Sequence, residues 1–167
     1  MFSRRLLFVV IFVFVSGLIL RAQRIVYSDP DRDDNRRMNF EIIGKINGNF
    51  LIYKNLRNKN WIDILDNDMK EVNKVYLDYM PEDRLINVDF FPYNDFFYAI
   101  YQYQKKNIVY CEAAKIDGNG KKISDVIELD TTHIGFAANN KIYSVISSED
   151  KNLLMVFKIN SRNKENM

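Results

Sequence analysis

The sequence has only one cysteine and one histidine among its 167 residues. The single cysteine, Cys111, excludes an intrachain disulfide, and its distance from the N-terminus excludes the lipid-bearing cysteine of a lipoprotein. A structural zinc site takes four cysteine or histidine ligands, so Cys111 and His133 cannot form one. The sequence also lacks a G-x-S-x-G or comparable nucleophile motif. We therefore expect no catalytic, cofactor-binding or metal-binding residues in this chain, and no cofactor.

Neither sign of charge is in large excess. The chain has 24 basic and 22 acidic residues, a net charge of +2. Three of the basic residues, Arg4, Arg5 and Arg21, fall in the first 22 positions, so the remainder has 21 basic against 22 acidic residues. Binding to nucleic acid needs positive charge concentrated on one face of the protein. We therefore expect no nucleic-acid partner.

The one long apolar run lies at the N-terminus. It extends over residues 6–20 and follows the basic residues Arg4 and Arg5, and the small residue Ala22 comes shortly after it. A basic segment, a short apolar segment and a small residue together indicate a secretory signal peptide, here residues 1–22. The run is short for a spanning helix, which needs about 20 apolar residues. The alternative to a cleaved signal peptide is an N-terminal anchor that stays in the membrane. This segment, if uncleaved, is the only membrane contact that we expect. Both predict export to the periplasm, the outer membrane or the exterior.

Residues 23–38 are predicted to form a polar linker. Asp29, Asp31 and Asp33 alternate there, as the first three ligands of a calcium-binding loop do. The glycine and the bidentate glutamate that such a loop requires are missing from the expected positions. We interpret the acids as solvated linker residues whose charges are balanced by neighbouring arginines.

Three stretches after the linker repeat one order of segments. Each has a β-rich run, a polar link, a second β-rich run and a polar turn, and we expect antiparallel hairpins at 50–65, 97–116 and 142–159. The turns place three lysines in one register, with spacings of 51 and 43 residues, and these are Lys70, Lys121 and Lys164. The chain is 47% apolar and 14% aromatic, which favours a folded core. A repeat of roughly 40–50 residues built from strands is typical of propeller blades.

We therefore predict an all-β fold, a partial β-propeller of about two and three-quarter four-stranded antiparallel blades after an N-terminal signal helix. The repeat domain is 39–167, with blades at about 39–80, 84–130 and 133–167, the last incomplete. Besides the hairpins, strands are expected at 39–46, 72–79, 84–91, 123–130 and 133–139. Because propellers close with four to eight blades, the chain is expected to be part of a longer protein or to close by association. A β-sandwich of ten or eleven strands is the alternative fold.

The signal peptide and the repeats resemble a family of exported bacterial β-propeller proteins, of the Tol-associated and WD40-like groups. The similarity rests on "NFLIYKNLRNKNWIDILDNDMKEV", "FFYAIYQYQKKNIVYCEAAKIDGNGKKI" and "NKIYSVISSEDKNLLMVFKINSRNK", within residues 40–167. No Trp-Asp dipeptide ends a blade, as it does in WD40 repeats. The resemblance implies an envelope location and a repeat fold, and it transfers no catalytic residue, because propellers have many functions.

Two groups of residues invite a catalytic interpretation and are better explained by the fold. A Ser–His–Asp site would have to use His133 with Asp130, but their position between two blades favours inter-blade hydrogen bonding by Thr131, Thr132 and His133. Cys111 lies in an apolar strand, where a buried and inert thiol is expected.

Acidic pairs and a concentration of aromatic residues remain. Glu82 with Asp83, and Asp125 with Glu128, are interpreted as solvated turn residues, because acids are too frequent here to identify a glycosidase pair. Residues 89–103 contain eight phenylalanines or tyrosines among fifteen positions. We expect them to pack between blades, with a ligand surface on a propeller face as the second interpretation.

These observations favour a non-catalytic exported envelope protein that acts as a propeller-type binding or scaffold module. Its partner would be a protein or another envelope component. The alternative function is the N-terminal propeller domain of a larger hydrolase of the peptidase type, whose catalytic domain lies outside this chain.

Export is predicted to be accompanied by cleavage before Gln23. Intact-mass measurement of the protein recovered from an exporting cell tests this, and a mass that lacks residues 1–22 is expected. Recovery of the uncleaved chain in the membrane fraction would instead support the anchor.

Overall fold

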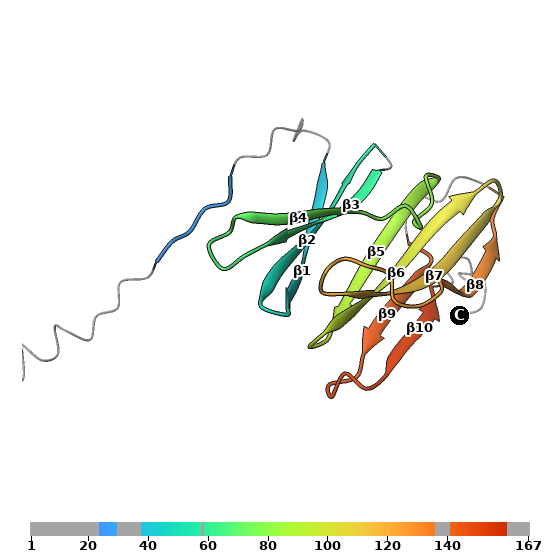
Figure 1. Cartoon of the computed structure of the whole chain (residues 1–167). Helices are drawn as coiled ribbons and strands as arrows, with labels where there is room; N and C mark the ends of the chain where they lie inside the picture. The colour runs from blue at the N-terminus through green and yellow to red at the C-terminus, as the bar shows by residue number, and fades with distance from the viewer. Residues whose placement is uncertain (1–23, 30–37, 58, 136–140, 160–167) are drawn as a thin grey trace, which may run out of the picture.

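The computed structural model describes residues 24–29, 38–57, 59–135 and 141–159. In this part of the chain there are ten β-strands and no helix, so the all-β prediction is confirmed. The strands form three antiparallel sheets of four, four and two strands, none of which is closed (Figure 1). The predicted signal peptide lies outside the described residues.

Each sheet is a meander in which neighbours in the sequence are neighbours in space. Sheet 1 contains β1 (Asn39–Ile46), β2 (Asn49–Leu56), β3 (Lys59–Leu65) and β4 (Glu71–Tyr76). Sheet 2 contains β5 (Arg84–Pro92), β6 (Phe96–Lys105), β7 (Ile108–Asp117) and β8 (Ile127–His133). Sheet 3 contains β9 (Tyr143–Ser147) and β10 (Leu154–Lys158).

All three predicted hairpins are present, as β2–β3, β6–β7 and β9–β10. The strand predicted at 123–130 begins only at Ile127. Lys122 still bridges Ile116 of β7, but the pairing with β7 is then interrupted and resumes at Ile127. Ser124 and Asp125 lie in that gap, and both residue types favour turns over strands. The strand predicted at 133–139 is wrong at its start, because His133 ends β8 and the next two residues belong to no strand. Its remaining residues lie outside the described part.

The first two hairpins are closed by the same kind of tight turn. The pairings of Leu56 with Lys59 and of Lys105 with Ile108 leave two residues in each turn. The first turn residue, Arg57 or Lys106, has a φ of 50° or 54°. A positive φ is what a two-residue hairpin turn with right-handed strand twist requires. The β2–β3 and β6–β7 hairpins therefore share one turn conformation.

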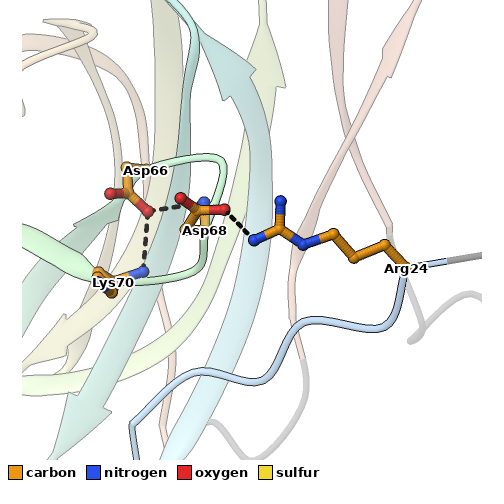
Figure 2. A network of polar contacts seen from close by, with 4 residues as sticks. All are labelled: Arg24, Asp66, Asp68 and Lys70. Atoms are coloured by element: carbon orange, nitrogen blue, oxygen red, sulfur yellow. Dashed lines mark hydrogen bonds and ion pairs between the residues drawn. The ribbon is translucent and has the colours of Figure 1, made fainter.

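A second shared turn follows β3 and β7. In the β3–β4 turn, the carboxylate of Asp66 accepts hydrogen bonds from the backbone N–H groups of Asp68 (2.8 Å) and Lys70 (3.0 Å), as Figure 2 shows. Met69, just before the lysine, has a φ of 58°. An exposed ion pair of 2.7 Å between Arg24 and Asp68 also places the segment before the first strand beside this turn.

The β7–β8 turn repeats this geometry. The carboxylate of Asp117 accepts from the N–H groups of Asn119 (2.9 Å) and Lys121 (2.8 Å), and Gly120 has a φ of 77°. Lys121 is exposed, as is Lys70 at the equivalent position. The β3–β4 and β7–β8 turns thus share one hydrogen-bond pattern with an exposed lysine at the same position, whereas Lys164 lies outside the described residues.

Sheet 2 is buried on both of its faces. On β6, Phe97, Ala99 and Tyr101 face sheet 1, and the intervening Ile100 and Gln102 face sheet 3. The first core joins sheets 1 and 2, and its fully buried large side chains are Ile46, Leu51, Ile62, Phe97, Tyr101 and Ile116. The second core joins sheets 2 and 3 around Ile100, Val109, Cys111 and Tyr143. Each such buried aromatic or aliphatic side chain contributes about 1.5–3 kcal/mol.

A buried glutamine attaches sheet 3 to sheet 2. The side-chain oxygen of Gln102 accepts from the N–H groups of Ile142 (2.9 Å) and Tyr143 (2.8 Å), and its amide nitrogen donates to the Tyr143 carbonyl (2.7 Å). The side chain is 1% exposed, so these bonds have little competition from water. Gln102 thereby satisfies the backbone of β9 as a neighbouring strand would.

Tyr143 adds a second connection between the same sheets. Its hydroxyl donates to a carboxylate oxygen of Asp130 (2.8 Å), and it lies within hydrogen-bond distance of the Thr132 hydroxyl, which must therefore be the donor of that bond. Inter-blade hydrogen bonding was predicted for residues 131–133, and Thr132 does form a hydrogen bond that joins sheets 2 and 3.

The third hairpin does not keep the register of the other two. The lysine spacing of 43 residues aligns Val145 with Gln102 and Val156 with Ala113. Gln102 and Ala113 point from sheet 2 toward sheet 3, whereas Val145 and Val156 point the opposite way, from sheet 3 toward sheet 2. A shift of one residue exchanges the two faces of a strand. The prediction that all three hairpins superpose in the lysine register is therefore wrong for the third. Val156 still packs, half-buried, against the cluster that contains the fully buried Cys111, as predicted.

The described strands also form three sheets, whereas the alternative β-sandwich fold would have two. The sheets of four strands approach each other at their first strands, where Cα atoms of β1 and β5 come within 8 Å. Gly44 of β1 faces Pro92 of β5 there. A Cβ atom added at Gly44 would lie 3.5 Å from the Pro92 side chain, which is an ordinary van der Waals contact. The described chain is thus a stack of three sheets, with sheet 2 in the middle.

Replacing Gln102 with leucine is expected to lower the free energy of unfolding by about 2–4 kcal/mol, because two buried backbone groups of Tyr143 and a partly buried one of Ile142 lose their partner. Urea unfolding measures the loss, and faster amide hydrogen exchange in β9 and β10 shows where it acts. Gln104→Leu is the control, since the Gln104 amide bonds the exposed carbonyl of Lys106, and its cost should be much smaller. Equal losses for the two variants would contradict the role given to Gln102.

Candidate ligand-binding hollow

Segments of all three sheets line one hollow of about 660 Å³. Sheet 1 contributes the end of β1, sheet 2 the β5–β6 turn, and sheet 3 the β9–β10 turn, which lie toward the bottom of Figure 1. Its lining residues are Gly44, Lys45, Pro92, Tyr93, Asn94, Asp95, Phe96, Asp150, Lys151 and Asn152. A hollow where several loops converge on a rigid β-scaffold is a common position for a binding site.

Aromatic rings form the sheet 2 side of the hollow. Tyr93 and Phe96 stack with their centroids 4.8 Å apart, and Tyr98 meets both edge-on, at 5.9 and 5.5 Å. The ammonium of Lys115 lies 3.9 Å from the Phe96 centroid, a cation–π contact. All three rings are half-buried. They present rigid apolar surface beside polar groups, as aromatic residues do in many binding sites.

The turns that form the hollow are fixed by hydrogen bonds. The Tyr93 N–H donates to the Phe96 carbonyl (2.8 Å), and the Tyr93 hydroxyl donates to the Lys151 carbonyl (2.8 Å), which joins the turns of sheets 2 and 3. The Asp150 carboxylate accepts from the Ser148 hydroxyl and the Asn152 N–H, and these bonds hold the pKa of Asp150 below its usual range. Asp150 is therefore occupied in stabilising its own turn.

Polar groups of both signs remain at the rim. Asn94 and Asp95 are exposed at the tip of the β5–β6 turn, and the side chain of Lys151 is exposed on the opposite turn. Lys45 is directed to Asn67, to which it donates at 2.7 Å. In the part of the chain that the structure describes, no three His, Cys, Asp or Glu residues are grouped as a metal site. The hollow is thus suited chemically to a polar organic group or a peptide segment.

A smaller cleft of about 190 Å³ lies near the beginnings of β1 and β5, toward the end of these strands that is opposite the hollow. It is lined by Asn39, Phe40, Glu41, Tyr53, Asn55, Leu85, Ile86, Asn87 and Val88. Partial burial, and then the charge of Asp89, raise the pKa of Glu41, while Lys141 acts in the opposite sense. Lys141 also forms a loose ion pair of 3.6 Å with Asp89. The buried amide nitrogen of Asn87 has no hydrogen-bond partner among the residues that the structure describes.

The structure explains most of the residues first weighed for catalysis. Cys111 is fully buried, and burial raises the pKa of its thiol to about 12, so the expected inert thiol is what is found. His133 is exposed at the end of β8, and the Asp130 carboxylate bonds Tyr143. The Tyr143 bond is also the main reason that the pKa of Asp130 is lowered.

The remaining acids do not converge on a site. Glu82, Asp125 and Glu128 are exposed and Asp83 is half-buried, in turns or on the edge strand β8. Of the calcium candidates, Asp29 is exposed, and Asp31 and Asp33 lie outside the described residues.

The aromatic stretch divides between the core and the lining of the hollow. Phe90, Phe97 and Tyr101 pack between sheets 1 and 2, whereas Tyr93 and Phe96 line the hollow. The turn residues in "PYND" (92–95) between aromatic runs are the sequence signal for this division. Nothing comparable in the sequence indicated that Gly44 and Asn152 would line the same hollow, since that depends on how the sheets stack.

Comparison with protein-family models, with curated proteins and with solved structures gives no match. Among the described residues there is no helix long and apolar enough to cross a membrane. The function is therefore inferred from the geometry and chemistry of the chain.

Glu41→Gln is expected to stabilise the protein slightly near neutral pH, by under about 1 kcal/mol because the group is partly solvated. The folded-state pKa of Glu41 is raised, so its ionisation opposes folding once the pH exceeds the ordinary value, and the gain should vanish in acid, where both states are protonated. Urea midpoints at neutral and acidic pH measure this. The exposed residue Glu82 supplies the control, and Glu82→Gln should change neither midpoint. A gain for Glu41→Gln of the same size in acid would contradict the assignment.

Proposed function

We propose that this chain is a non-catalytic binding or scaffold module of the cell envelope, built as part of a β-propeller, and that the loop-lined hollow is its ligand surface. The observation that carries the proposal is that segments of all three sheets, the end of β1 and the β5–β6 and β9–β10 turns, line one hollow. Ligand surfaces on propellers and barrels are likewise made by loops that a rigid sheet scaffold positions.

Three features of the fold support a propeller arrangement. The sheets follow one another along the chain, and each is a meander of neighbouring strands. Sheet 2 is covered on both faces by its neighbours in sequence, as a blade is. The two four-stranded sheets also approach each other at their first strands, which are the strands nearest the axis in a propeller.

The envelope location rests on the sequence of residues 1–22, and the partner class rests on the hollow. Stacked rings, an exposed amide, an exposed carboxylate and an ammonium group fit a peptide segment or another polar envelope component. Aromatic and polar groups in this combination are typical of protein recognition surfaces. Export would place such a surface in contact with envelope proteins.

Photo-crosslinking in the intact cell tests the proposal. A photoreactive amino acid at Asn94, in the lining of the hollow, is expected to yield a discrete crosslinked product. The same amino acid at Ser124, exposed in the β7–β8 connection, is the control and should yield none. Replacement of Tyr93 with alanine should reduce the Asn94 product at least several-fold, since it removes a stacked ring. No product at Asn94, or equal products at both positions, would overturn the assignment of the hollow.

A further inference from the structure

Two large sheet faces of the described chain are left uncovered, one at each end of the stack. The outer face of sheet 1, on the side away from sheet 2, carries Phe40, Ile42, Val72 and Tyr76, which are 59% to 67% exposed. The outer face of sheet 3 carries Ile146, Leu153, Met155, Phe157 and Ile159, which are 42% to 72% exposed. Large apolar side chains exposed together on one sheet face indicate an interaction surface.

The outer face of sheet 1 is built for close packing. Trp61 and Asp63 of β3 lie on it and are only 4% and 2% exposed, because neighbouring side chains cover them. Asp63 is paired with Lys54 at 2.7 Å and lies 3.8 Å from Lys74. The charges at the centre of this face therefore have partners within it, which reduces the cost of covering it.

The repeat indicates which kind of surface fits there. In the lysine register Asp63 and Leu65 of sheet 1 correspond to Ala114 and Ile116 of sheet 2, and the latter pair faces sheet 1. The outer face of sheet 1 is thus the counterpart of the sheet 2 face that packs against the preceding sheet. In a continued stack, this face would be covered by the face that a preceding sheet turns toward its successor, as sheet 1 covers sheet 2. The outer face of sheet 3 is a face of that kind, because it points away from sheet 2 at the other end of the stack.

We propose that the outer face of sheet 3 in one copy packs on the outer face of sheet 1 in a second copy, and that two copies close a ring of six sheets. The inference deepens the proposed function and rests on its propeller arrangement. Each chain contributes three sheets, and six is within the four to eight blades of closed propellers. The contact is heterologous, since it joins two different faces, and with two copies it occurs twice.

The apolar area agrees with this occupant. Large side chains bury roughly 150–250 Å² each, so four or five that are about 60% exposed leave on the order of 500 Å² on each face. One contact would cover on the order of 1,000 Å² of apolar surface, which is near the lower limit of specific interfaces. A closed ring contains two such contacts, as a stable dimer requires.

The test compares the mass of the full-length chain in solution with that of two face variants, by sedimentation equilibrium over a series of concentrations. Ile42→Lys alters the sheet 1 face and Met155→Lys alters the sheet 3 face. Both side chains are over 60% exposed, so the single chain should fold, and a cooperative urea transition of each variant checks this. The wild type is expected at twice the chain mass and each variant at the chain mass. Ile127→Lys, at an apolar residue 59% exposed on β8, is the matched control and should keep the double mass.

Mixing the variants separates a heterologous contact from a symmetric one. Ile42→Lys keeps an intact sheet 3 face and Met155→Lys keeps an intact sheet 1 face, so an equimolar mixture should form a one-to-one complex, weaker than the wild-type pair. Association through the N-terminal apolar run would be unaffected by either change. A wild type that stays at the chain mass, a single variant that still pairs, or a mixture that does not associate would each overturn the inference.

The outcome is distinguishable from failure of the proposed function. Crosslinking at Asn94 together with a wild type of single mass would leave the hollow as a binding site and remove only the association. Paired copies with no Asn94 product would support the association and remove the hollow as the ligand surface.

Discussion

The arrangement of the described chain depends on one constraint, namely that sheet 2 buries both of its faces. Its central strands β6 and β7 must supply apolar or hydrogen-bonded side chains at their buried positions on both faces, since alternate residues enter different cores. Phe97 and Tyr101 meet sheet 1, and Ile100 and Gln102 meet sheet 3. The positions of sheets 1 and 3 therefore depend on β6, because alternate side chains of this strand pack against each of them.

Gln102 shows how a polar residue is accommodated under that constraint. An unpaired amide in such a core would cost several kcal/mol, but here it bonds two N–H groups and a carbonyl at the start of β9. The same contacts orient Tyr143, whose hydroxyl reaches Asp130 and Thr132 on β8. Sheet 3 therefore has polar attachments to two different strands of sheet 2, in addition to its apolar contact. This directionality is what fixes where the β9–β10 turn lies, and so the third side of the hollow.

Local features of the fold were accessible from the sequence, and long-range features were less so. The turns "DNDMK" and "DGNGK" carry their chemistry in adjacent residues, so their equivalence was predicted and then found in the Asp66 and Asp117 hydrogen bonds. The third hairpin was misaligned because one spacing cannot fix the face that a strand presents, and a one-residue shift exchanges faces. The aromatic stretch 89–103 was recognised, but its division between core and hollow depends on the stacking of the sheets. The hollow itself required one strand end and two turns that are far apart in the sequence.

The hollow and the uncovered faces follow from the same stacking. Meandering sheets packed face to face, each attached to the next, bring turns at one end of every sheet to the same side of the molecule, and this produces a shared loop surface. The same process leaves the first and last faces without a neighbour, since an open stack of any number of sheets always has two ends. A ring has no such ends, as a barrel has no strand edges. Closing the stack would therefore cover the exposed apolar faces of sheets 1 and 3, and it would add further turns around the side on which the hollow lies.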